Sequence, residues 1–390
     1  MKKVRLGIIG IGNMGSGHYS NIEKGLCPEI EVTAVADINP DRIRWANETM
    51  PDTVQKFDNA IDMLDSGLVD AAIVAVPHYD HPGLVIECLN RGIHVMCEKP
   101  AGVYTKQVRQ MNEAAKQHPD VVFGMMFNQR TNCVYRKMRE LIQSGEYGQI
   151  RRTNWLITSW YRPQAYYDSG AWRATWSGEG GGVLLNQCPH QLDLWQWICG
   201  MPKKVLTKMQ FGKWHNIEVE DDVTTYVEYE NGATGVFITS TGDAAGSNRF
   251  EVQMDKGKLV VENNKLTLYE LETAEPEFSK TNKEPFGSPK QTVIEVQTDG
   301  ENPQHVGVLN KFAAAILRGE PLVAGGEEGI NGLTLSNAMH LSAWLGKEIE
   351  LPFDEDLFYD ELMKRVATSV RKPETKAVFA DTSNTYSGVK

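Results

Sequence analysis

A lysine and a histidine with acid–base chemistry stand in two distinctive stretches of the sequence. Lys99 belongs to Glu98-Lys99-Pro100, which directly follows the apolar run from Ile93 to Cys97. We interpret this run as a buried strand of a parallel sheet, and open sheets of this kind bind ligands at the carboxyl ends of their strands. A lysine placed there can bond a substrate oxygen, and its pKa falls readily on burial. The spacing alone leaves a second interpretation open, in which the lysine extends from a strand end into solvent.

His190 lies in the second stretch, which runs from Gly180 to Asp193 and begins with three glycines. Asn186 and His190 are four residues apart, so on a helix they would share one face. Pro189 would either kink that helix or begin it late. An imidazole can accept the proton of an alcohol, although a single histidine on an otherwise apolar helix also fits a core position. Asp193, three residues further, is expected either to support His190 or to bind substrate.

A glycine-rich turn near the amino terminus predicts a dinucleotide site. The apolar strand from Val4 to Ile9 is followed by Gly10-Ile11-Gly12-Asn13-Met14-Gly15 and then by a helical pattern. In such a turn the glycines permit a tight bend, close approach of a pyrophosphate and helix–strand packing, with the phosphates at the helix amino terminus. Asp37 ends the next predicted strand, 22 residues beyond Gly15, which suits the acid that binds the adenosine ribose. Since a carboxylate there repels a 2′-phosphate, the sequence predicts NAD in preference to NADP.

The elements around these residues predict a two-domain α/β fold. Strands and helices alternate from residue 4 to residue 126, as in a doubly wound parallel sheet. The chain then carries a long β-type run at 149–161, strands from 205 to 271, a polar loop at 272–289 and helices between 303 and 370. We therefore expect a dinucleotide-binding Rossmann domain at 1–126, a substrate-binding domain with an antiparallel sheet at 127–370, and a polar tail at 371–390.

Aromatic and polar side chains crowd the stretch from Trp160 to Trp176. Sugar rings bind by stacking their CH faces on aromatic rings and by giving their hydroxyls to polar groups. Aromatic residues between prolines and glycines also serve loop packing, so both interpretations stay open on composition. The side chains that we expect to bind substrate in this stretch are Tyr161, Arg162, Gln164, Trp172 and Arg173.

Two histidines follow the strand that ends near Val76. His78 and His81 lie just past the carboxyl end of that strand, where a cofactor would bind. A solvated loop pair is the alternative that position leaves open. Their spacing of three residues could suit a metal, but no third ligand accompanies them, so we expect cofactor contact and no metal.

Composition excludes several classes of protein. The 390 residues contain 51 acidic and 40 basic side chains, a net charge of −11, which argues against nucleic acid as a partner. Apolar runs are too short to span a bilayer, and the amino terminus lacks the apolar core of a signal peptide, so we expect a cytoplasmic protein without a membrane partner. The six cysteines form no CxxC pair, which is typical of reduced thiols.

These stretches together resemble the Gfo/Idh/MocA family of NAD(P)-dependent oxidoreductases, named for glucose–fructose oxidoreductase, inositol dehydrogenase and a rhizopine catabolism protein. The resemblance covers essentially the whole chain, and it rests on the glycine-rich turn, the segment from Pro77 to His81, Glu98-Lys99-Pro100, Trp172-Arg173 and the block from Gly180 to Asp193. It implies a Rossmann domain followed by an α/β domain with an open, mostly antiparallel sheet. It also implies a tightly held NAD(P) and a homodimer or homotetramer formed through that sheet.

The resemblance completes the predicted site. The family's catalytic lysine and histidine match Lys99 and His190, and we expect Asn186 to act beside them. These three residues and Asp193 are also expected to contact substrate. Besides the glycine-rich turn and Asp37, the residues expected at the cofactor are Pro77, His78, His81, Glu98, Lys99, Asn128, Trp172 and Arg173.

One position departs from the family pattern. Many members carry Asp where this chain has Asn186, and an amide can neither take a proton nor offer a charge. Without that anion, Lys99 loses a partner that would favour its charged form. Our hypothesis is that Asn186 bonds a substrate hydroxyl or orients His190.

The residues and the resemblance predict an NAD-dependent dehydrogenase that oxidises a secondary hydroxyl of a pyranose sugar, glycoside or cyclic polyol. The aromatic loop looks like that of pyranose-oxidising relatives such as levoglucosan dehydrogenases, which favours carbon 3 of the ring. Two alternatives remain at this point. One is a redox-neutral glycoside-processing enzyme that recycles a tightly bound NAD. The other is a non-catalytic protein that senses NAD or sugar.

Overall fold

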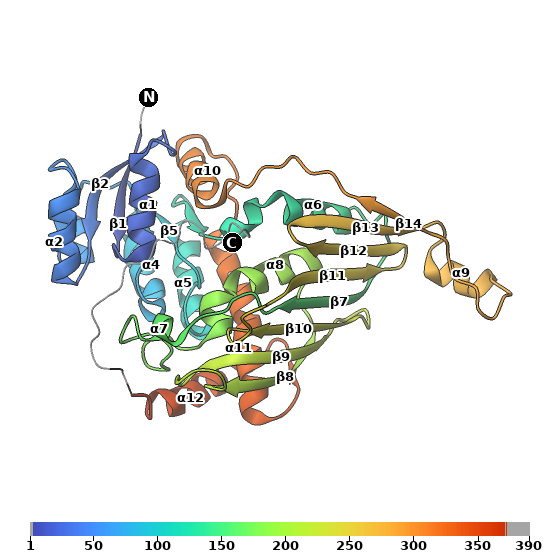
Figure 1. The fold of residues 1–390 in the computed structure, drawn as a ribbon. Helices are drawn as coiled ribbons and strands as arrows, with labels where there is room; N and C mark the ends of the chain where they lie inside the picture. Colours follow the sequence, from blue (N-terminus) through green and yellow to red (C-terminus); the bar gives the residue numbers. More distant parts are fainter. Residues whose placement is uncertain (1–2, 371, 373–390) are drawn as a thin grey trace.

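The structure of the protein, a computed structural model, describes residues 3–370 and 372. The chain forms two sheets, each covered by helices, and the elements of the two halves meet along a broad contact (Figure 1). An α/β fold with two sheets was predicted, and it is confirmed. The predicted polar tail at 371–390 lies, except for Lys372, outside the described residues.

The first sheet is parallel and has six strands in the order β3-β2-β1-β4-β5-β6. The order reverses between β1 and β4, and open α/β sheets bind ligands in the crevice at such a switch point. The Lys99 strand, β5, is the second neighbour of β1 on that side. The strands of this sheet are β1 (Val4–Ile9), β2 (Ile30–Ala36), β3 (Gln55–Phe57), β4 (Ala71–Val74), β5 (His94–Cys97) and β6 (Phe123–Met125).

Helices cover both faces of this sheet because successive strand residues are apolar on both sides. In β1, Leu6 and Ile8 face one core, whereas Ile9 faces the other. Asn39 and Asn59 cap helices by accepting from backbone N–H groups two residues ahead, which fixes where α2 and α3 begin. The helices are α1 (Asn13–Glu23), α2 (Pro40–Thr49), α3 (Ala60–Asp65), α4 (His81–Asn90) and α5 (Thr105–Gln117), with a short 3₁₀ turn at His78–Asp80.

A helix from late in the chain completes one of these two faces. Helix α10 (Gln304–Arg318) places Val308, Leu309 and Phe312 in the same buried cluster as Leu6 and Ile8 of β1. Figure 1 shows α10 beside α1 and far from its neighbours in sequence. The division of the chain into domains at residue 126 stays a prediction. Helix α10 follows that residue in the sequence but packs against the sheet of the first half.

The second sheet has nine strands in the order β14-β13-β12-β11-β7-β10-β9-β8-β15. Strands β7 and β10 pair in parallel, whereas the other pairs in the described part of the sheet are antiparallel. The predicted mostly antiparallel sheet is therefore confirmed. Its strands are β7 (Ile150–Ile157), β8 (Lys204–Phe211), β9 (Glu220–Glu228), β10 (Thr234–Ser240), β11 (Asn248–Met254), β12 (Gly257–Glu262), β13 (Lys265–Leu271), β14 (Gln291–Glu295) and β15 (Ile349–Glu350).

One face of the second sheet carries the core of this half. Trp155 of β7 stacks on Phe250 of β11 with ring centroids 4.2 Å apart, and Trp195 of α8 stacks on Phe237 of β10. Such pairs add offset-stacking energy to a large buried area. The helices of this half are α6 (Cys133–Gln143), α7 (Gln164–Tyr167), α8 (Pro189–Cys199), α11 (Gly329–Leu345) and α12 (Glu355–Val366), with 3₁₀ turns at Asn128–Thr131 and Gly326–Glu328.

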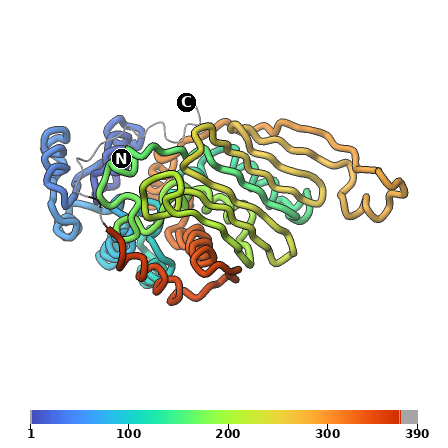
Figure 2. Tube along the Cα trace, turned by 60° about the horizontal axis from the view of Figure 1, so that its bottom comes forward, coloured from blue at the N-terminus to red at the C-terminus, as the bar shows by residue number. Residues whose placement is uncertain are grey.

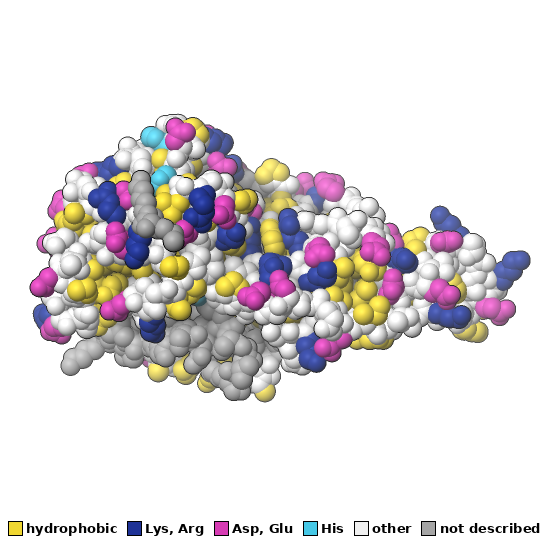
Figure 3. Space-filling view, turned by 90° about the horizontal axis from the view of Figure 1, so that it is seen from above, with side chains coloured by type: hydrophobic (Ala, Val, Ile, Leu, Met, Phe, Trp, Pro, Cys, Tyr) yellow, Lys and Arg dark blue, Asp and Glu magenta, His cyan; other side chains and the backbone are white. Residues whose placement is uncertain are grey.

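The other face of the second sheet stays open, and an arm extends from its edge. Residues 272–289 were predicted as a loop, but they contain a short helix, α9 (Glu275–Thr281), in this arm (Figure 2). Pro276 at the start of α9 suits the first helical turn, which explains why a proline did not prevent a helix here. On the face of the molecule seen from above, acidic and basic side chains are interspersed (Figure 3).

Candidate active site

The glycine-rich turn between β1 and α1 has the shape that a pyrophosphate needs. Gly10 has a φ of +85°, and a Cβ on it would lie 2.5 Å from the carbonyl oxygen of Ala75. A Cβ on Gly15 would lie 1.9 Å from the carbonyl oxygen of Gly10, so the first and third glycines are required by packing. Gly12 differs, because a Cβ there would meet no atom within 4 Å. The open space at Gly12, at the amino terminus of α1, fits the phosphates of a dinucleotide.

Asp37 lies at this turn, at the end of β2. Its Oδ2 accepts from the backbone N–H of Ile11 at 2.9 Å, and its Oδ1 accepts from that of Asn39 at 2.9 Å. The buried guanidinium of Arg42 donates through Nε to the carbonyl oxygen of Ile11 at 2.6 Å. The turn and the acid are thus tied together, as binding of the adenosine ribose requires. Ile11, Asn13 and Met14 complete the turn, and the residues present fit NAD.

Lys99 lies at the carboxyl end of β5 and reaches the second half of the chain. Its Nζ donates to the backbone carbonyl oxygen of Asn186 at 3.2 Å. Burial lowers the pKa of Lys99, while the negative charge of Glu98 acts against that shift. The interpretation of Lys99 as a solvated strand end is therefore wrong.

The Glu98 carboxylate accepts from the backbone N–H of Lys99 at 3.1 Å. The side chain is buried, and its Oε1 lies 2.7 Å from Nε2 of His18 on α1. Burial alone would raise the pKa of Glu98, but the hydrogen bond and charge of His18 lower it to about 2. Through this pair Glu98 joins the end of β5 to α1, and its predicted contact with the cofactor stays a prediction.

His78 and His81 are both buried, so a solvated loop pair is excluded. The two ring nitrogens of His81 lie 2.7 Å from the carbonyl oxygens of Pro100 and Val76. His81 therefore joins the ends of β4 and β5, and its predicted contact with the cofactor stays a prediction. His78, which follows Pro77, lies edge-on to Trp172 with centroids 5.8 Å apart, and its Nδ1 lies 3.2 Å from the carbonyl oxygen of Glu179.

His190 and Asn186 stand on two different helical segments. Val183–Gln187 forms a single π-helical turn, and α8 begins only at Pro189, so the expectation of one shared helical face is wrong. The late start at Pro189 was one of the two predicted outcomes. Burial and the positive charge of Lys99 lower the pKa of His190 well below its usual value, so its ring is a neutral proton acceptor.

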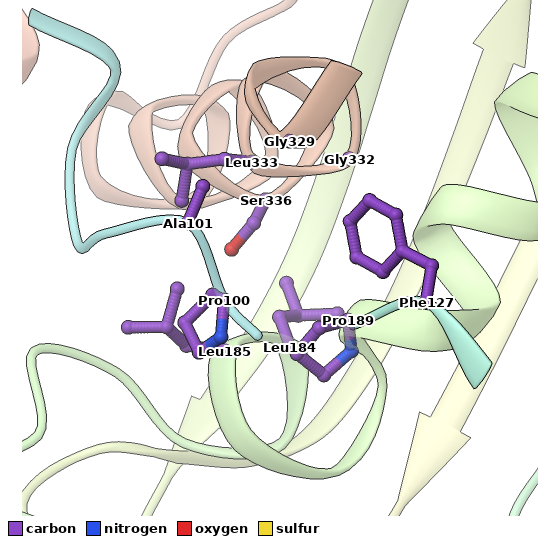
Figure 4. A pocket seen from close by; sticks show the side chains of 10 residues that line it. All are labelled: Pro100, Ala101, Phe127, Leu184, Leu185, Pro189, Gly329, Gly332, Leu333 and Ser336. Atoms are coloured by element: carbon purple, nitrogen blue, oxygen red, sulfur yellow. The ribbon is translucent and has the colours of Figure 1, made fainter. Parts of the chain in front are cut away.

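An apolar cluster includes Pro100 and Pro189, the chain neighbours of Lys99 and His190 (Figure 4). The cavity at its centre measures about 10 Å³, close to the smallest volume that holds one water molecule. Because the neighbours of both residues line one cavity, Lys99 and His190 belong to the same region of the molecule. The cavity is lined by Pro100, Ala101, Phe127, Leu184, Leu185, Pro189, Gly329, Gly332, Leu333 and Ser336.

The aromatic stretch forms a wall beside Asn186 and Gln187. Three donors converge on the hydroxyl oxygen of Tyr166: Nη1 of Arg173 at 2.9 Å, Nδ2 of Asn186 at 3.3 Å and Nε2 of Gln187 at 3.4 Å. The Arg173 guanidinium also lies 4.7 Å from the Trp172 ring centroid. Trp172 and Arg173 therefore lie in the site, and Tyr166 joins them.

Other predicted substrate residues lie further along the same stretch. Arg162 stacks 5.2 Å from the Tyr166 ring centroid, and Tyr161 is 44% exposed. Gln164 accepts from the backbone N–H of Asn216 at 2.9 Å and also donates to Asp168, so it ties two loops together. The substrate contact of Gln164 stays a prediction.

Asp193 and Asn128 are buried in separate polar contacts. Both oxygens of Asp193 accept from Arg130, at 2.7 and 2.8 Å, and each partner is nearly fully buried. The prediction that Asp193 supports His190 or binds substrate stays a prediction beside this ion pair. Asn128, expected at the cofactor, donates to Gln304 at the start of α10.

Glu179 is a residue of the site that the sequence reasoning missed. Its side chain is 2% exposed, and Oε1 accepts from the amide Nδ2 of Asn186. The backbone around it turns at Gly180, whose φ is +82°. A charged residue in the run Gly178-Glu179-Gly180 was the available signal, because buried charges need a partner.

Among residues 3–370 and 372, no group of three His, Cys, Asp or Glu side chains could hold a metal ion. Within the same residues, no helix is long and apolar enough to cross a membrane.

Comparison with known proteins identifies the two halves separately. Residues 4–125 match a family described as an oxidoreductase family with an NAD-binding Rossmann fold, and residues 135–260 match the GFO/IDH/MocA C-terminal domain. The myo-inositol 2-dehydrogenase of Thermotoga maritima is 25% identical over 357 residues, which cover 89% of this chain and 98% of that protein.

Solved structures of two dehydrogenases superpose on nearly the whole chain. The WlbA dehydrogenase of Bordetella pertussis, crystallised with NADH and UDP-GlcNAcA, superposes with a TM-score of 0.77 and 25% identity over 91% of this chain and 99% of that one. Levoglucosan dehydrogenase with NADH and levoglucosan has a TM-score of 0.74 at 19% identity, over 90% of this chain and 100% of that one. At that identity, the second likeness concerns the fold alone.

Proposed function

The chain belongs to the GFO/IDH/MocA family of NAD-binding oxidoreductases, and from this we propose that it oxidises a secondary hydroxyl of a pyranose sugar, glycoside or cyclic polyol. The family includes NAD-dependent inositol dehydrogenases, which act on CH–OH groups. One observation carries the proposal. Lys99 of the Rossmann half binds the backbone of Asn186 in the other half, four residues before His190, and its charge lowers the pKa of that histidine, so a lysine and a neutral histidine lie in the same region.

An alcohol loses a hydride from carbon and a proton from oxygen when it is oxidised. The nicotinamide, when bound, accepts the hydride. In our proposal His190 takes the proton, because its lowered pKa keeps the ring neutral and able to accept. Lys99 donates to the same oxygen and stabilises the negative charge that develops on it.

The fit to a sugar or polyol comes from the wall of the site. Tyr166, Trp172 and Arg173 offer an aromatic face beside hydrogen-bond donors, which a ring with several hydroxyls can use. The similarity to a myo-inositol dehydrogenase and to a dehydrogenase crystallised with a nucleotide sugar supports this class. Within this class of substrates, the proposed site of oxidation is carbon 3 of the ring.

The cofactor that we propose is NAD. Asp37 at the end of β2 binds the turn through Ile11 and leaves a carboxylate where the adenosine ribose would lie. NADP would bring its phosphate against that negative charge.

The open face of the second sheet supports a proposed homodimer or homotetramer. Leu206 of β8 lies opposite Tyr226 of β9, and both are about two-fifths exposed (39% and 38%). Leu156 of β7 is exposed on the same side at 38%. Light scattering after size-exclusion chromatography tests this, and Leu206→Lys should shift the protein toward monomer.

A panel of sugars, inositols and glycosides tests the function. Each compound is incubated with the enzyme and with NAD or NADP, and absorbance of the reduced nicotinamide is followed together with product formation. Formation of a ketone with equimolar NADH supports the dehydrogenase. Product without NADH release would point to a redox-neutral reaction, and no product from any compound contradicts the proposal.

A further inference from the structure

The amide of Asn186 has its two hydrogens already committed. One hydrogen of Nδ2 goes to Oε1 of Glu179, and the other points to the hydroxyl oxygen of Tyr166 at 3.3 Å. In the described part of the chain no group donates to Oδ1 of Asn186. A carboxamide offers two donor hydrogens and one acceptor oxygen, so the acceptor is the part that remains for a ligand.

Glu179 fixes this orientation. Its Oε2 accepts from the backbone N–H of Ala174 at 2.5 Å, and Nη1 of Arg173 lies 4.0 Å from its Oε1. An ionised carboxylate can only accept, so it can face the NH₂ end of an amide and not the oxygen end. Exchange of Nδ2 and Oδ1 would set two acceptors against each other in a buried site.

Several charged groups surround the Glu179 carboxylate. Burial raises the pKa of Glu179 above its usual value. The charge of Arg173 and the hydrogen bonds from Ala174 and Asn186 reduce this shift. The titratable or charged side chains that interact with it are Lys99, Tyr167, Arg173 and Glu220, and His78 contacts its backbone carbonyl oxygen.

The position of Asn186 limits which hydroxyl its oxygen can serve. Lys99 Nζ binds the backbone carbonyl of the same residue, so the amide lies beside the lysine that holds the reacting oxygen. The reacting hydroxyl has a single hydrogen, and that hydrogen goes to His190 in oxidation. Oδ1 of Asn186 must therefore accept from a different hydroxyl, on a carbon next to the one that reacts.

We propose that Glu179 is a positioning residue, which turns the Asn186 amide so that Oδ1 accepts a hydrogen bond from a second substrate hydroxyl. The substrates are accordingly vicinal diols, in which the oxidised hydroxyl has a hydroxyl neighbour. This inference rests on the proposed function for the substrate, but the contact between Glu179 and Asn186 is independent of it.

The first test is a double-mutant cycle of Glu179→Gln and Asn186→Asp, read as thermal unfolding at several pH values. Asn186→Asp alone sets two buried carboxylates at hydrogen-bond distance, so they share one proton and the pKa of the pair rises. That variant should unfold at lower temperature as pH rises from 5 to 8, as a group with a raised folded-state pKa requires.

The double variant exchanges the carboxylate and the amide between the two positions. It keeps one acceptor and one amide, so its unfolding temperature and its pH dependence should return toward those of the parent protein. Glu218→Gln is the matched control. Glu218 also accepts from backbone N–H groups, but these groups belong to Trp176 and Val370. Additive effects of the two single changes would overturn the inference.

The second test uses substrate pairs. For the best polyol of the panel, a deoxy analogue that lacks the hydroxyl next to the oxidised carbon should lose kcat/KM by about tenfold, the effect of one neutral hydrogen bond. The loss should appear mainly as a higher KM, with little change in kcat. In Glu179→Gln the ratio of kcat/KM for the polyol to that for its deoxy analogue should fall toward one. In Glu218→Gln this ratio should stay as it is in the parent protein.

The outcomes separate the two proposals. If the parent protein oxidises no compound in the panel, the proposed function fails, and the stability cycle still decides whether Glu179 orients Asn186. If the parent is active but keeps its full preference for the diol in Glu179→Gln, the inference alone is overturned.

Discussion

Lys99 and Asn186 are joined by a hydrogen bond from Nζ to the backbone carbonyl oxygen, at 3.2 Å. The residues are 87 positions apart and come from the two halves of the chain. A backbone acceptor holds the ammonium group without a counter-charge of its own. The lysine can therefore remain in place while its proton is shared with a substrate oxygen.

Lys99→Ala should reduce turnover by about 10²- to 10⁴-fold, the range for loss of a positioned acid–base group. NAD affinity, read from quenching of tryptophan fluorescence, should change little because the glycine-rich turn is untouched. Lys106→Ala is the control, since Lys106 is exposed and pairs with Asp356. Near-normal turnover of Lys99→Ala would refute the role assigned to this lysine.

Asp37→Ser should raise the ratio of NADP to NAD usage by about tenfold or more, since ~1.4 kcal/mol corresponds to one factor of ten. The change removes the negative charge and leaves a hydroxyl that can still accept from Ile11. The measurement is kcat/KM with each cofactor at saturating substrate. Asp41→Ser, four residues further on the exposed start of α2, should leave the ratio unchanged, and an unchanged ratio in Asp37→Ser would count against NAD selection by this acid.

Acid should destabilise the protein through its buried histidines. Burial lowers the pKa of His78 and His190 well below 6.5 and that of His305 to about 4. A depressed pKa in the folded state means that stability is complete above pH 6.5 and is lost as pH falls toward 4. The unfolding temperature should therefore drop across this window.

His305→Gln is the variant that isolates one contribution. It should lose less stability than the parent protein between pH 7 and pH 4, because one buried group no longer resists protonation. Each unit of pKa depression corresponds to about 1.4 kcal/mol. Parallel curves for the two proteins would rule out a contribution from His305.

Arg130→Met should cost about 3–5 kcal/mol of unfolding free energy, because it leaves the Asp193 carboxylate buried without its partner. Urea unfolding at neutral pH measures the loss. Glu328→Gln also removes a partner of Arg130, but its side chain is 42% exposed, so this change should cost only about 0–1 kcal/mol. Equal costs for the two variants would show that burial does not govern this network.

Local patterns predicted the parts of the site that local chemistry governs. Gly10 and Gly15 are required by contacts within a strand–turn–helix unit, and Asp37 closes the same unit, so spacing alone located them. Lys99 could be placed at a strand end by its apolar run. Its role, and that of His190, came from the resemblance, because nothing in the spacing joins residues of different domains.

The contacts that the sequence did not predict join segments that lie apart in the chain. Asp193 looked available three residues after His190, but Arg130 reaches it from another helix. Glu98 and His81 stand in the predicted place, and yet they pack against α1 and the ends of two strands. Glu179 was missed for the same reason, since a glutamate among glycines indicates that a partner is needed but does not identify the amide seven residues later as that partner.

The position of α10 has a consequence for protein synthesis. Val308, Leu309 and Phe312 of this helix complete the apolar face that Leu6 and Ile8 begin, so part of one face of the first sheet stays uncovered until residues 304–318 have left the ribosome. A nascent chain arrested before α10 should therefore be cut readily by protease within residues 4–125, and one arrested well after α10 should resist. If both resist equally, the first half folds vectorially without its last helix, and a chaperone has less exposed surface to recognise during translation.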